Sequence, residues 1–233
     1  MSNLNHLNNL NNLNSRWLIL MAVFLAILGL MLAAAFDGPY AQGALKWTRV
    51  GNFSSAYSVR CMALYQNKLY VGLGDGKVMR YNGGNSWTDI HKPNDSIGMY
   101  VYSMTTFGNL LVVGGDFNNG ARVWTYNGST WSQINDDGFG LGSTIYQARA
   151  LAVYNNELYA TGSGNGQKFR VYKYSGSGTV WADVTGLWDD HVALSAISWN
   201  GYLWVGTENT STGTEIWRYD GTNWTQANKD GFG

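Results

Sequence analysis

The sequence predicts an all-β chain in which one four-stranded unit occurs four times. A turn made of tyrosine, any residue and glycine is followed by a tryptophan, and these tryptophans lie 44, 50 and 43 residues apart. The composition agrees, because 30 glycines, only 2 prolines and 15% aromatic residues suit short antiparallel strands and many turns. The recurring residues are Tyr81, Gly83, Trp87, Tyr126, Gly128, Trp131, Tyr174, Gly176, Trp181, Tyr219, Gly221 and Trp224.

The N-terminal segment differs in composition from the repeats. Residues 1–16 form a leader rich in asparagine and leucine, which we expect to be mostly unstructured because asparagine competes for backbone hydrogen bonds. Residues 17–36 carry no charge, and a segment of this length matches the hydrocarbon core of a bilayer. It is either the h-region of a signal peptide cleaved near Ala33–Ala35 or an uncleaved membrane anchor. Residues 37–45 form a linker.

Both interpretations export the repeats. Arg16 precedes the apolar segment, so the N-terminus should stay inside and the rest of the chain should cross the membrane. We therefore expect a secreted protein, or one anchored in the membrane through residues 17–36. The single cysteine, Cys61, has no partner for an internal disulfide, and its apolar run predicts a buried, unreactive side chain.

Each repeat contains four predicted strands, and the last repeat illustrates them. Ala193–Trp199 is apolar, and Asn200-Gly201 is a tight-turn dipeptide that leads into Tyr202–Val205. Glu215–Tyr219 alternates polar and apolar residues, which predicts a strand with one solvated face. A second turn then leads into Trp224–Gln226. The four units cover approximately residues 57–92, 100–136, 147–185 and 192–228.

Four short strands in each unit are typical of one blade of a β-propeller. A single such sheet has two apolar faces and cannot be stable alone, whereas sheets packed face to face around an axis bury both. We expect the repeated tryptophans to fill the space between sheets and the repeated tyrosines to cover the turn before the fourth strand. These residues, with their turn glycines, are therefore interpreted as framework.

The predicted strands do not add up to a closed ring of complete blades. Lys46–Val50, with Trp47 at its centre, resembles a fourth strand without the three strands that should precede it. We expect an extra outer strand here, so that residues 46–233 form four complete blades and part of another. The hypotheses are a fragment of a larger propeller or a ring completed by a second chain. The alternative is a four-bladed ring in which Trp47 marks a loose outer edge.

The repeats resemble those of kelch proteins and of the central domain of galactose oxidase, including exported bacterial propellers. The resemblance covers residues 46–233 and depends on Gly114-Gly115, the downstream Tyr126 and Trp131. The Asp220–Trp224 turn is also similar to blades of small fucose-binding propeller lectins. The resemblance implies the propeller fold, but the copper ligands of galactose oxidase have no counterparts here, so that activity is not implied.

Composition and spacing argue against several functions. Charged residues make up 13% of the chain and its formal net charge is +0, whereas a nucleic-acid partner needs a basic surface. His6, His91 and His191 show no triad spacing, and no cluster of histidine, cysteine and acids has metal-ligand spacing. We expect no cofactor. Calcium at Asn135–Gly138 is the alternative, but this loop lacks the alternating acids of an EF-hand. The seven arginines from Arg49 to Arg218 are not expected at equivalent strand positions, so no sialidase-type arginine triad is predicted.

A ligand should bind where the loops after the second and fourth strands share one face of the propeller. Aromatic rings beside carboxylates would suit the faces and hydroxyls of a sugar. The sequence favours an exported, non-catalytic module that binds a glycan or a protein. One alternative is part of an oxidase-like or glycan-cleaving enzyme whose catalytic residues lie outside this chain, and another is a structural repeat in a surface assembly. The candidate ligand-binding residues are Asp75, Asp116, Trp188, Asp189 and Glu208.

Overall fold

The computed structural model describes residues 47–53, 58–90, 100–164, 169–186 and 192–233. The predicted leader, apolar segment and linker lie outside these residues. Among the described residues, no helix combines the length and apolar character that crossing a membrane requires. Val50–Gly233 forms one compact unit, which holds all of the strands.

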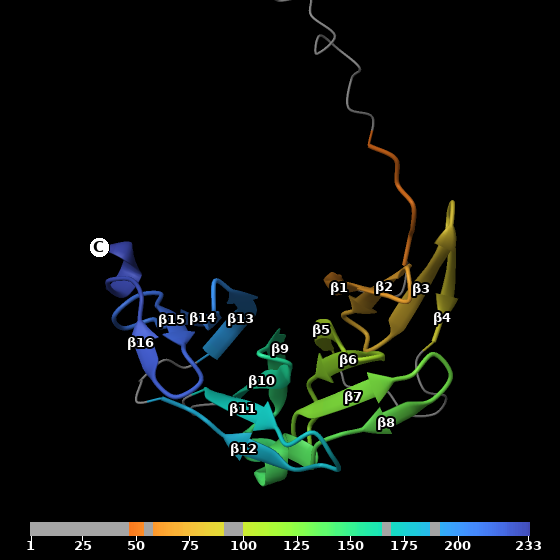
Figure 1. Cartoon of the computed structure of the whole chain (residues 1–233). Coiled ribbons are helices and arrows are strands. Elements are labelled where there is room, and N and C mark those ends of the chain that lie inside the picture. Colours follow the sequence, from red (N-terminus) through yellow and green to blue (C-terminus); the bar gives the residue numbers. More distant parts are fainter. Residues whose placement is uncertain (1–46, 54–57, 91–99, 165–168, 187–191) are drawn as a thin grey trace, which may run out of the picture. The chain divides into compact units, whose positions relative to one another are not determined.

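The compact unit contains four antiparallel sheets, each built from four strands that are consecutive in the sequence (Figure 1). This confirms the predicted all-β architecture. Sheet 1 has β1 (Val59–Tyr65), β2 (Lys68–Leu73), β3 (Val78–Gly83) and β4 (Ser86–Asp89), and sheet 2 has β5 (Val101–Phe107), β6 (Leu110–Gly115), β7 (Arg122–Tyr126) and β8 (Trp131–Gln133). Sheet 3 has β9 (Gln147–Tyr154), β10 (Glu157–Ser163), β11 (Arg170–Tyr174) and β12 (Trp181–Asp183), and sheet 4 has β13 (Val192–Trp199), β14 (Tyr202–Glu208), β15 (Ile216–Tyr219) and β16 (Trp224–Gln226).

Short 3-10 helices follow two of the outer strands, which the sequence did not predict. They are η1 (Asp137–Gly140) and η2 (Gly142–Thr144) after β8, and η3 (Asp230–Phe232) after β16. The hairpins joining the first two strands have the expected chemistry. In sheet 4, Asn200 and Gly201 have φ of 48° and 79°, the left-handed values that a tight hairpin turn requires.

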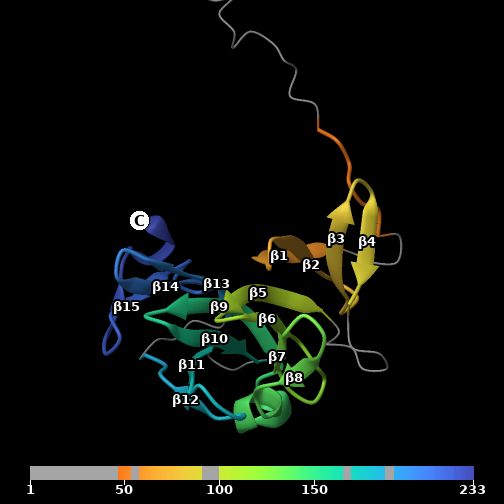
Figure 2. The same ribbon diagram turned by 45° about the vertical axis from the view of Figure 1, so that its right-hand side comes forward.

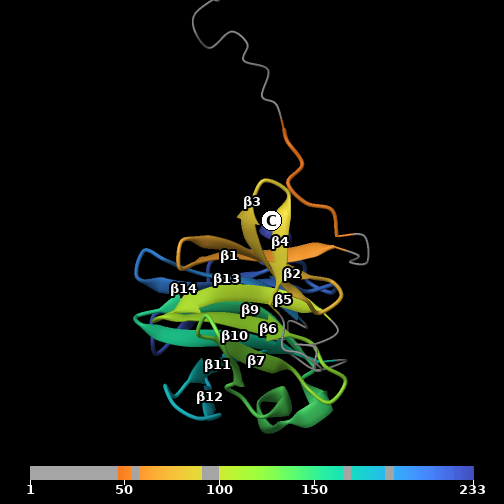
Figure 3. The same ribbon diagram turned by 90° about the vertical axis from the view of Figure 1, so that its right-hand side faces the viewer.

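The first strands of the sheets lie together at the centre of the unit. β1 contacts β5, β5 contacts β9 and β9 contacts β13. Figure 1 shows these strands nearest a common centre, and Figures 2 and 3 show the same arrangement from two other directions. The four inner strands therefore bring residues far apart in the sequence close to one axis.

Apolar side chains fill the three spaces between neighbouring sheets. Tyr70 and Val113 belong to the core between sheets 1 and 2, whereas Leu158 shares the next core with Val112. Leu203 lies in the third core, between sheets 3 and 4. Each sheet therefore covers an apolar face of its neighbour, as the sequence predicted.

The repeated tryptophans link each sheet to the chain that precedes it. Each indole Nε1 donates a hydrogen bond of 2.7 Å to a backbone carbonyl oxygen, which belongs to the residue after β4, β8 or β12 for the last three sheets and to Val50 for the first. Each indole also packs against the repeated tyrosine of its own sheet, with ring centres 4.7 to 5.1 Å apart. The four hydrogen bonds join Trp87 to Val50, Trp131 to Ile90, Trp181 to Ile134 and Trp224 to Val184.

Replacing one of these indoles tests the linking role. Trp131→Phe is expected to lower the free energy of unfolding by about 1–3 kcal/mol, because it leaves the part-buried Ile90 carbonyl without its donor. Trp199→Phe is the matched control, since Trp199 is exposed, and its effect should stay within about 0.5 kcal/mol. Urea unfolding of the full chain measures both changes. Equal losses at the two positions would contradict the role.

The extra outer strand expected around Trp47 is not formed. Residues 47–53 carry no strand, and Trp47 is 94% exposed. A fourth strand needs a third strand beside it to complete its hydrogen bonds, and no further sheet precedes β1 in the described residues. Val50 nevertheless accepts the indole bond from Trp87, as Ile90 accepts it from Trp131.

The outward faces of sheets 1 and 4 leave apolar side chains exposed. Trp199 of β13 holds the position that Tyr65 and Tyr154 hold in β1 and β9. Both tyrosines are buried and donate hydrogen bonds of 2.9 Å to a hairpin of the next sheet, whereas Trp199 is 63% exposed. Met62 of β1 is likewise exposed, while its counterpart Leu151 is buried. That a longer propeller or a second chain covers these faces stays a prediction.

Candidate functional site

Each inner strand contains a β-bulge near its beginning. The pairing with the second strand skips one residue in every sheet, and a bulge of this kind re-aims the side chain of the extra residue. Because the skip occurs at the same place in every sheet, the four extra residues are structurally equivalent. They are Arg60, Tyr102, Arg149 and Leu194.

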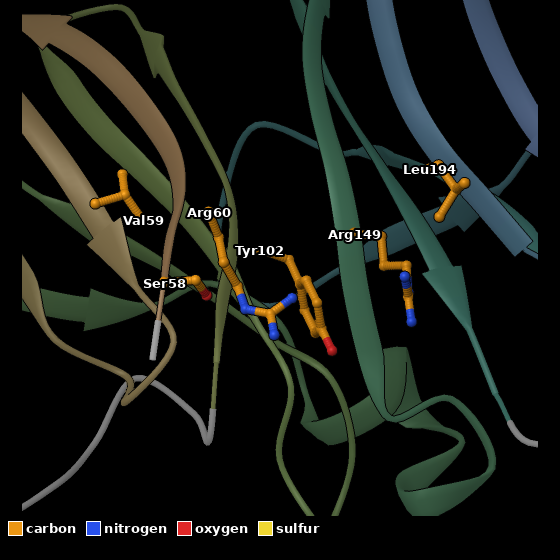
Figure 4. Close-up of a pocket in the computed structure, with 6 residues that line it drawn as sticks. All are labelled: Ser58, Val59, Arg60, Tyr102, Arg149 and Leu194. Atoms are coloured by element: carbon orange, nitrogen blue, oxygen red, sulfur yellow. The ribbon is translucent and has the colours of Figure 1, made fainter. Parts of the chain in front are cut away.

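These four residues, together with Ser58 and Val59, line a pocket of about 390 Å³ (Figure 4). Every sheet thus contributes to one site. In β1, Val59 pairs with Leu73, the last residue of β2, so the bulge lies where the second strand ends. The pocket therefore lies at the end of the sheets where we expected a ligand.

Two guanidinium groups and Tyr102 belong to the polar part of the pocket, and the Tyr100 ring lies beside Arg60. The Arg60 Cζ atom lies 4.5 Å from the centre of the Tyr100 ring and 5.0 Å from that of Tyr102. The Arg149 Cζ atom lies 4.8 Å from the centre of the Tyr102 ring. Both cations therefore gain cation–π stabilisation near the same ring.

Hydrogen bonds hold Arg149 in place. Its Nε donates to Gln147 Oε1 at 2.8 Å, and Gln147 Nε2 lies 3.4 Å from the Tyr102 hydroxyl. Gln147 is itself buried, so it provides a fixed support. The remaining nitrogen atoms of the Arg149 guanidinium make no hydrogen bond to any described residue.

Asp116 is the carboxylate near this arrangement. It is only 6% exposed and accepts a hydrogen bond of 2.8 Å from the Tyr100 backbone N–H. Burial raises the pKa of Tyr102 and Asp116 raises it further, while Arg149 and Arg60 oppose this shift. Tyr102 is therefore a neutral phenol at physiological pH, able to donate and to accept a hydrogen bond.

The other predicted site residues have different places. Asp75 forms an ion pair of 3.1 Å with Lys77 and accepts a bond from the Lys77 backbone N–H, so it stabilises the turn between β2 and β3. Glu208 is exposed at the end of β14, and neither Asp75 nor Glu208 lines the pocket. Trp188 and Asp189 lie outside the described residues.

The expectation that arginines do not occupy equivalent strand positions was wrong for Arg60 and Arg149. Both are bulge residues of inner strands. A signal was present in the sequence, because Arg60 directly precedes the apolar run Cys61–Leu64 and Arg149 precedes Ala150–Val153. The bulges themselves could not be read from the sequence, since they depend on the register between strands.

The loop considered for calcium uses its polar side chains within the protein. Asn135 is buried, and its Oδ1 accepts a hydrogen bond of 2.7 Å from the Val123 N–H. Asp137 forms an ion pair of 2.8 Å with Arg122, whose hydrogen bond holds the pKa of that carboxyl below its usual range. Over the described ranges, no group of three or more histidine, cysteine or acidic residues could hold a metal ion.

Cys61 is partly buried rather than fully buried as expected. It packs against the core between sheets 1 and 2, and burial raises its thiol pKa to about 12. Since the thiolate is the reactive form, we expect slow alkylation of Cys61 by iodoacetamide at pH 8 in the folded chain and rapid alkylation in urea. Mass spectrometry of the labelled chain follows both rates. Equal rates in the two states would contradict the protection of this thiol by the fold.

Comparison with known proteins gives a fold but no family. No family model and no curated protein matches the sequence. Among solved structures, the SapL1 lectin in complex with alpha methyl fucoside aligns with a TM-score of 0.52 at 17% identity, covering 72% of this chain and 60% of the lectin. A lectin from Aleuria aurantia, described as a six-bladed β-propeller, aligns with a TM-score of 0.50 at 17% identity, covering 72% of this chain and 61% of the lectin.

The chain has a β-propeller fold. A chain of the mitotic checkpoint complex also aligns, with a TM-score of 0.52 at 17% identity, over 74% of this chain and 52% of that one. The aligned part of this propeller thus spans about half to three fifths of these neighbours. The more specific resemblance to kelch repeats stays a prediction.

Proposed function

We propose that this chain is a non-catalytic binding propeller and that its ligand, a glycan or a protein, enters the pocket between the inner strands. The observation that supports this function is that each of the four sheets contributes an equivalent bulge residue to the pocket. Guanidinium and hydroxyl groups bind and orient a ligand. No described residue there pairs a nucleophile with a base, as covalent catalysis requires.

A glycan is the favoured ligand. Propeller neighbours of this chain include a lectin in complex with alpha methyl fucoside and another in complex with Fucalpha1-6GlcNAc. The pocket volume of about 390 Å³ lies within the range of small-molecule sites. Tyr102 and Ser58 place hydroxyl groups at this pocket, and these can donate to and accept from sugar hydroxyls.

A glycan array probed with the full chain tests this function. We expect binding to at least one class of glycan and a loss of at least about tenfold in affinity for Leu194→Trp, which fills the pocket without changing its charge. Ile197→Trp is the matched control, because Ile197 is also exposed on β13 but does not line the pocket. Binding to no glycan would refute a glycan ligand, and equal binding by both variants would refute this pocket as the binding site.

We also propose that the propeller acts at the cell surface or outside the cell. The support is the uncharged segment of residues 17–36 preceded by Arg16. Expression in a bacterial host, followed by fractionation and N-terminal sequencing, tests it. The propeller should be sensitive to added protease in spheroplasts, or should be found in the periplasm or medium. Protection from protease in intact spheroplasts would contradict export.

A further inference from the structure

We propose that the pocket binds an anionic glycan, whose carboxylate or sulfate group lies against the guanidinium groups of Arg60 and Arg149. This inference rests on the proposed function and specifies the ligand class for the same site. The juxtaposition that supports it is a pair of arginines, from sheets 1 and 3, that converge near Tyr102 (Figure 4).

The two arginines differ from Arg122 and Arg170 in their electrostatic partners. Arg122 pairs with Asp137 at 2.8 Å, and Arg170 pairs with Asp183 at 2.5 Å. Within the described ranges, neither Arg60 nor Arg149 has a carboxylate at ion-pair distance. A planar guanidinium offers a fork of donors that matches the oxygen atoms of a carboxylate or a sulfate.

The guanidinium groups are held in position before a ligand arrives. Arg60 packs near two tyrosine rings, and Arg149 near one ring while Gln147 accepts its Nε proton. All of these residues belong to or adjoin paired strands, so little flexibility is lost on binding. Pre-organisation of this kind lowers the cost of binding an anion.

The local charge favours an anion although the whole chain has a formal net charge of +0. Asp116 is the acidic group that acts on Tyr102, and two arginines oppose it. Asp75 is paired with Lys77, so it adds no net charge. The pocket therefore has a positive balance that the overall composition does not show.

The neutral part of the pocket indicates a sugar rather than an acidic peptide. Ser58 and Tyr102 line the pocket together with the arginines, and their hydroxyl groups can both donate and accept, as sugar hydroxyls require. Leu194 provides an apolar surface on the far side, suited to the C–H face of a sugar ring. A simple acidic side chain would use the guanidinium groups and leave these contacts unmade.

Binding of the full chain to four polymers tests the proposal. Polygalacturonate carries carboxylates, dextran sulfate carries sulfates, dextran is neutral, and poly-glutamate carries carboxylates without sugar. We expect one of the two anionic polysaccharides to bind at least about tenfold more tightly than dextran and poly-glutamate, the effect of a charged hydrogen bond. Comparing the first two separates a carboxylate from a sulfate ligand.

Substitutions then locate the site. Arg60→Ala and Arg149→Ala should each lower the affinity about tenfold or more, whereas Arg149→Lys should retain part of it because the charge remains. Arg218→Ala is the matched control, because Arg218 also lies over a tyrosine ring, at 4.9 Å from Tyr202, but outside the pocket. It removes the same charge and should leave binding unchanged.

Two substitutions of opposite charge at Leu194 keep the test valid if an arginine variant fails to fold. Leu194 is exposed at the pocket, so Leu194→Glu should abolish binding to the anionic polymer and Leu194→Lys should preserve it. Equal binding by these two variants would overturn the anionic site. Tight binding of poly-glutamate would refute the inference that the ligand contains a sugar. Preference for dextran or another neutral glycan would refute the inference that the ligand is anionic, while leaving the proposed function standing. The absence of all glycan binding would refute both the anionic glycan and the glycan ligand favoured above.

Discussion

Gly120→Ala is expected to lower the free energy of unfolding by about 3–5 kcal/mol, because backbone strain and steric overlap add at this position. Gly120 precedes β7 and has a φ of 137°, which side chains other than hydrogen rarely tolerate. A Cβ atom there would lie 2.4 Å from Gly138 N and 2.7 Å from Gly142 O. Both are backbone atoms of residues 137–144, the segment that contains η1 and η2 and that we call the η1–η2 loop, so the clash cannot be relieved by rotating a side chain.

Gly176→Ala is the control that separates the two causes. Gly176 has a φ of 95°, but a Cβ atom there would have no neighbour within 4 Å. We expect it to cost about 1–2 kcal/mol from backbone strain alone. Chemical denaturation of both variants gives the difference. If Gly120→Ala cost no more than Gly176→Ala, the close packing of the η1–η2 loop against the start of β7 would be wrong.

Leu158→Ala is expected to lower the free energy of unfolding by about 2–5 kcal/mol. Leu158, on β10, is fully buried in the core between sheets 2 and 3, where it lies with Val112 and Val123. Truncation removes apolar contacts and leaves a cavity between two sheets, which can collapse only in part because the hydrogen-bonded strands within each sheet are rigid.

Leu141→Ala is the matched control for this core. Leu141 lies between η1 and η2 and is exposed, so its truncation should cost less than about 1 kcal/mol. Thermal and urea unfolding of both variants measure the difference. A small loss for Leu158→Ala would mean that sheets 2 and 3 do not share a packed core in solution.

The last repeat shows how closely the sequence predicts its strands. Trp224–Gln226 agrees with β16, and Tyr202–Val205 begins at the first residue of β14 but ends before Glu208. The strand is longer because its final residues, Gly206–Glu208, pair with the start of β13. Their side-chain pattern alone gave no reason to extend it.

The candidate site was predicted less well than the strands. The expected face of the propeller holds the pocket, and Asp116 supports Tyr100 beside it. Arg60 and Arg149 were missed, because a bulge is a property of the pairing between two strands. Asp75 and Glu208, the acids after two of the second strands, were predicted to bind a ligand because loops carry function, yet they lie outside the pocket.

The sequence by itself determined the number of sheets, their four-strand composition and the turns that join them. These features depend on residues near one another in the chain, such as Asn200 and Gly201, whose turn geometry is local. Only the tertiary structure decided that Arg60, Tyr102, Arg149 and Leu194 meet in one pocket. That meeting requires four equivalent bulges and the packing of successive sheets around an axis, and neither is encoded in the spacing of any single repeat.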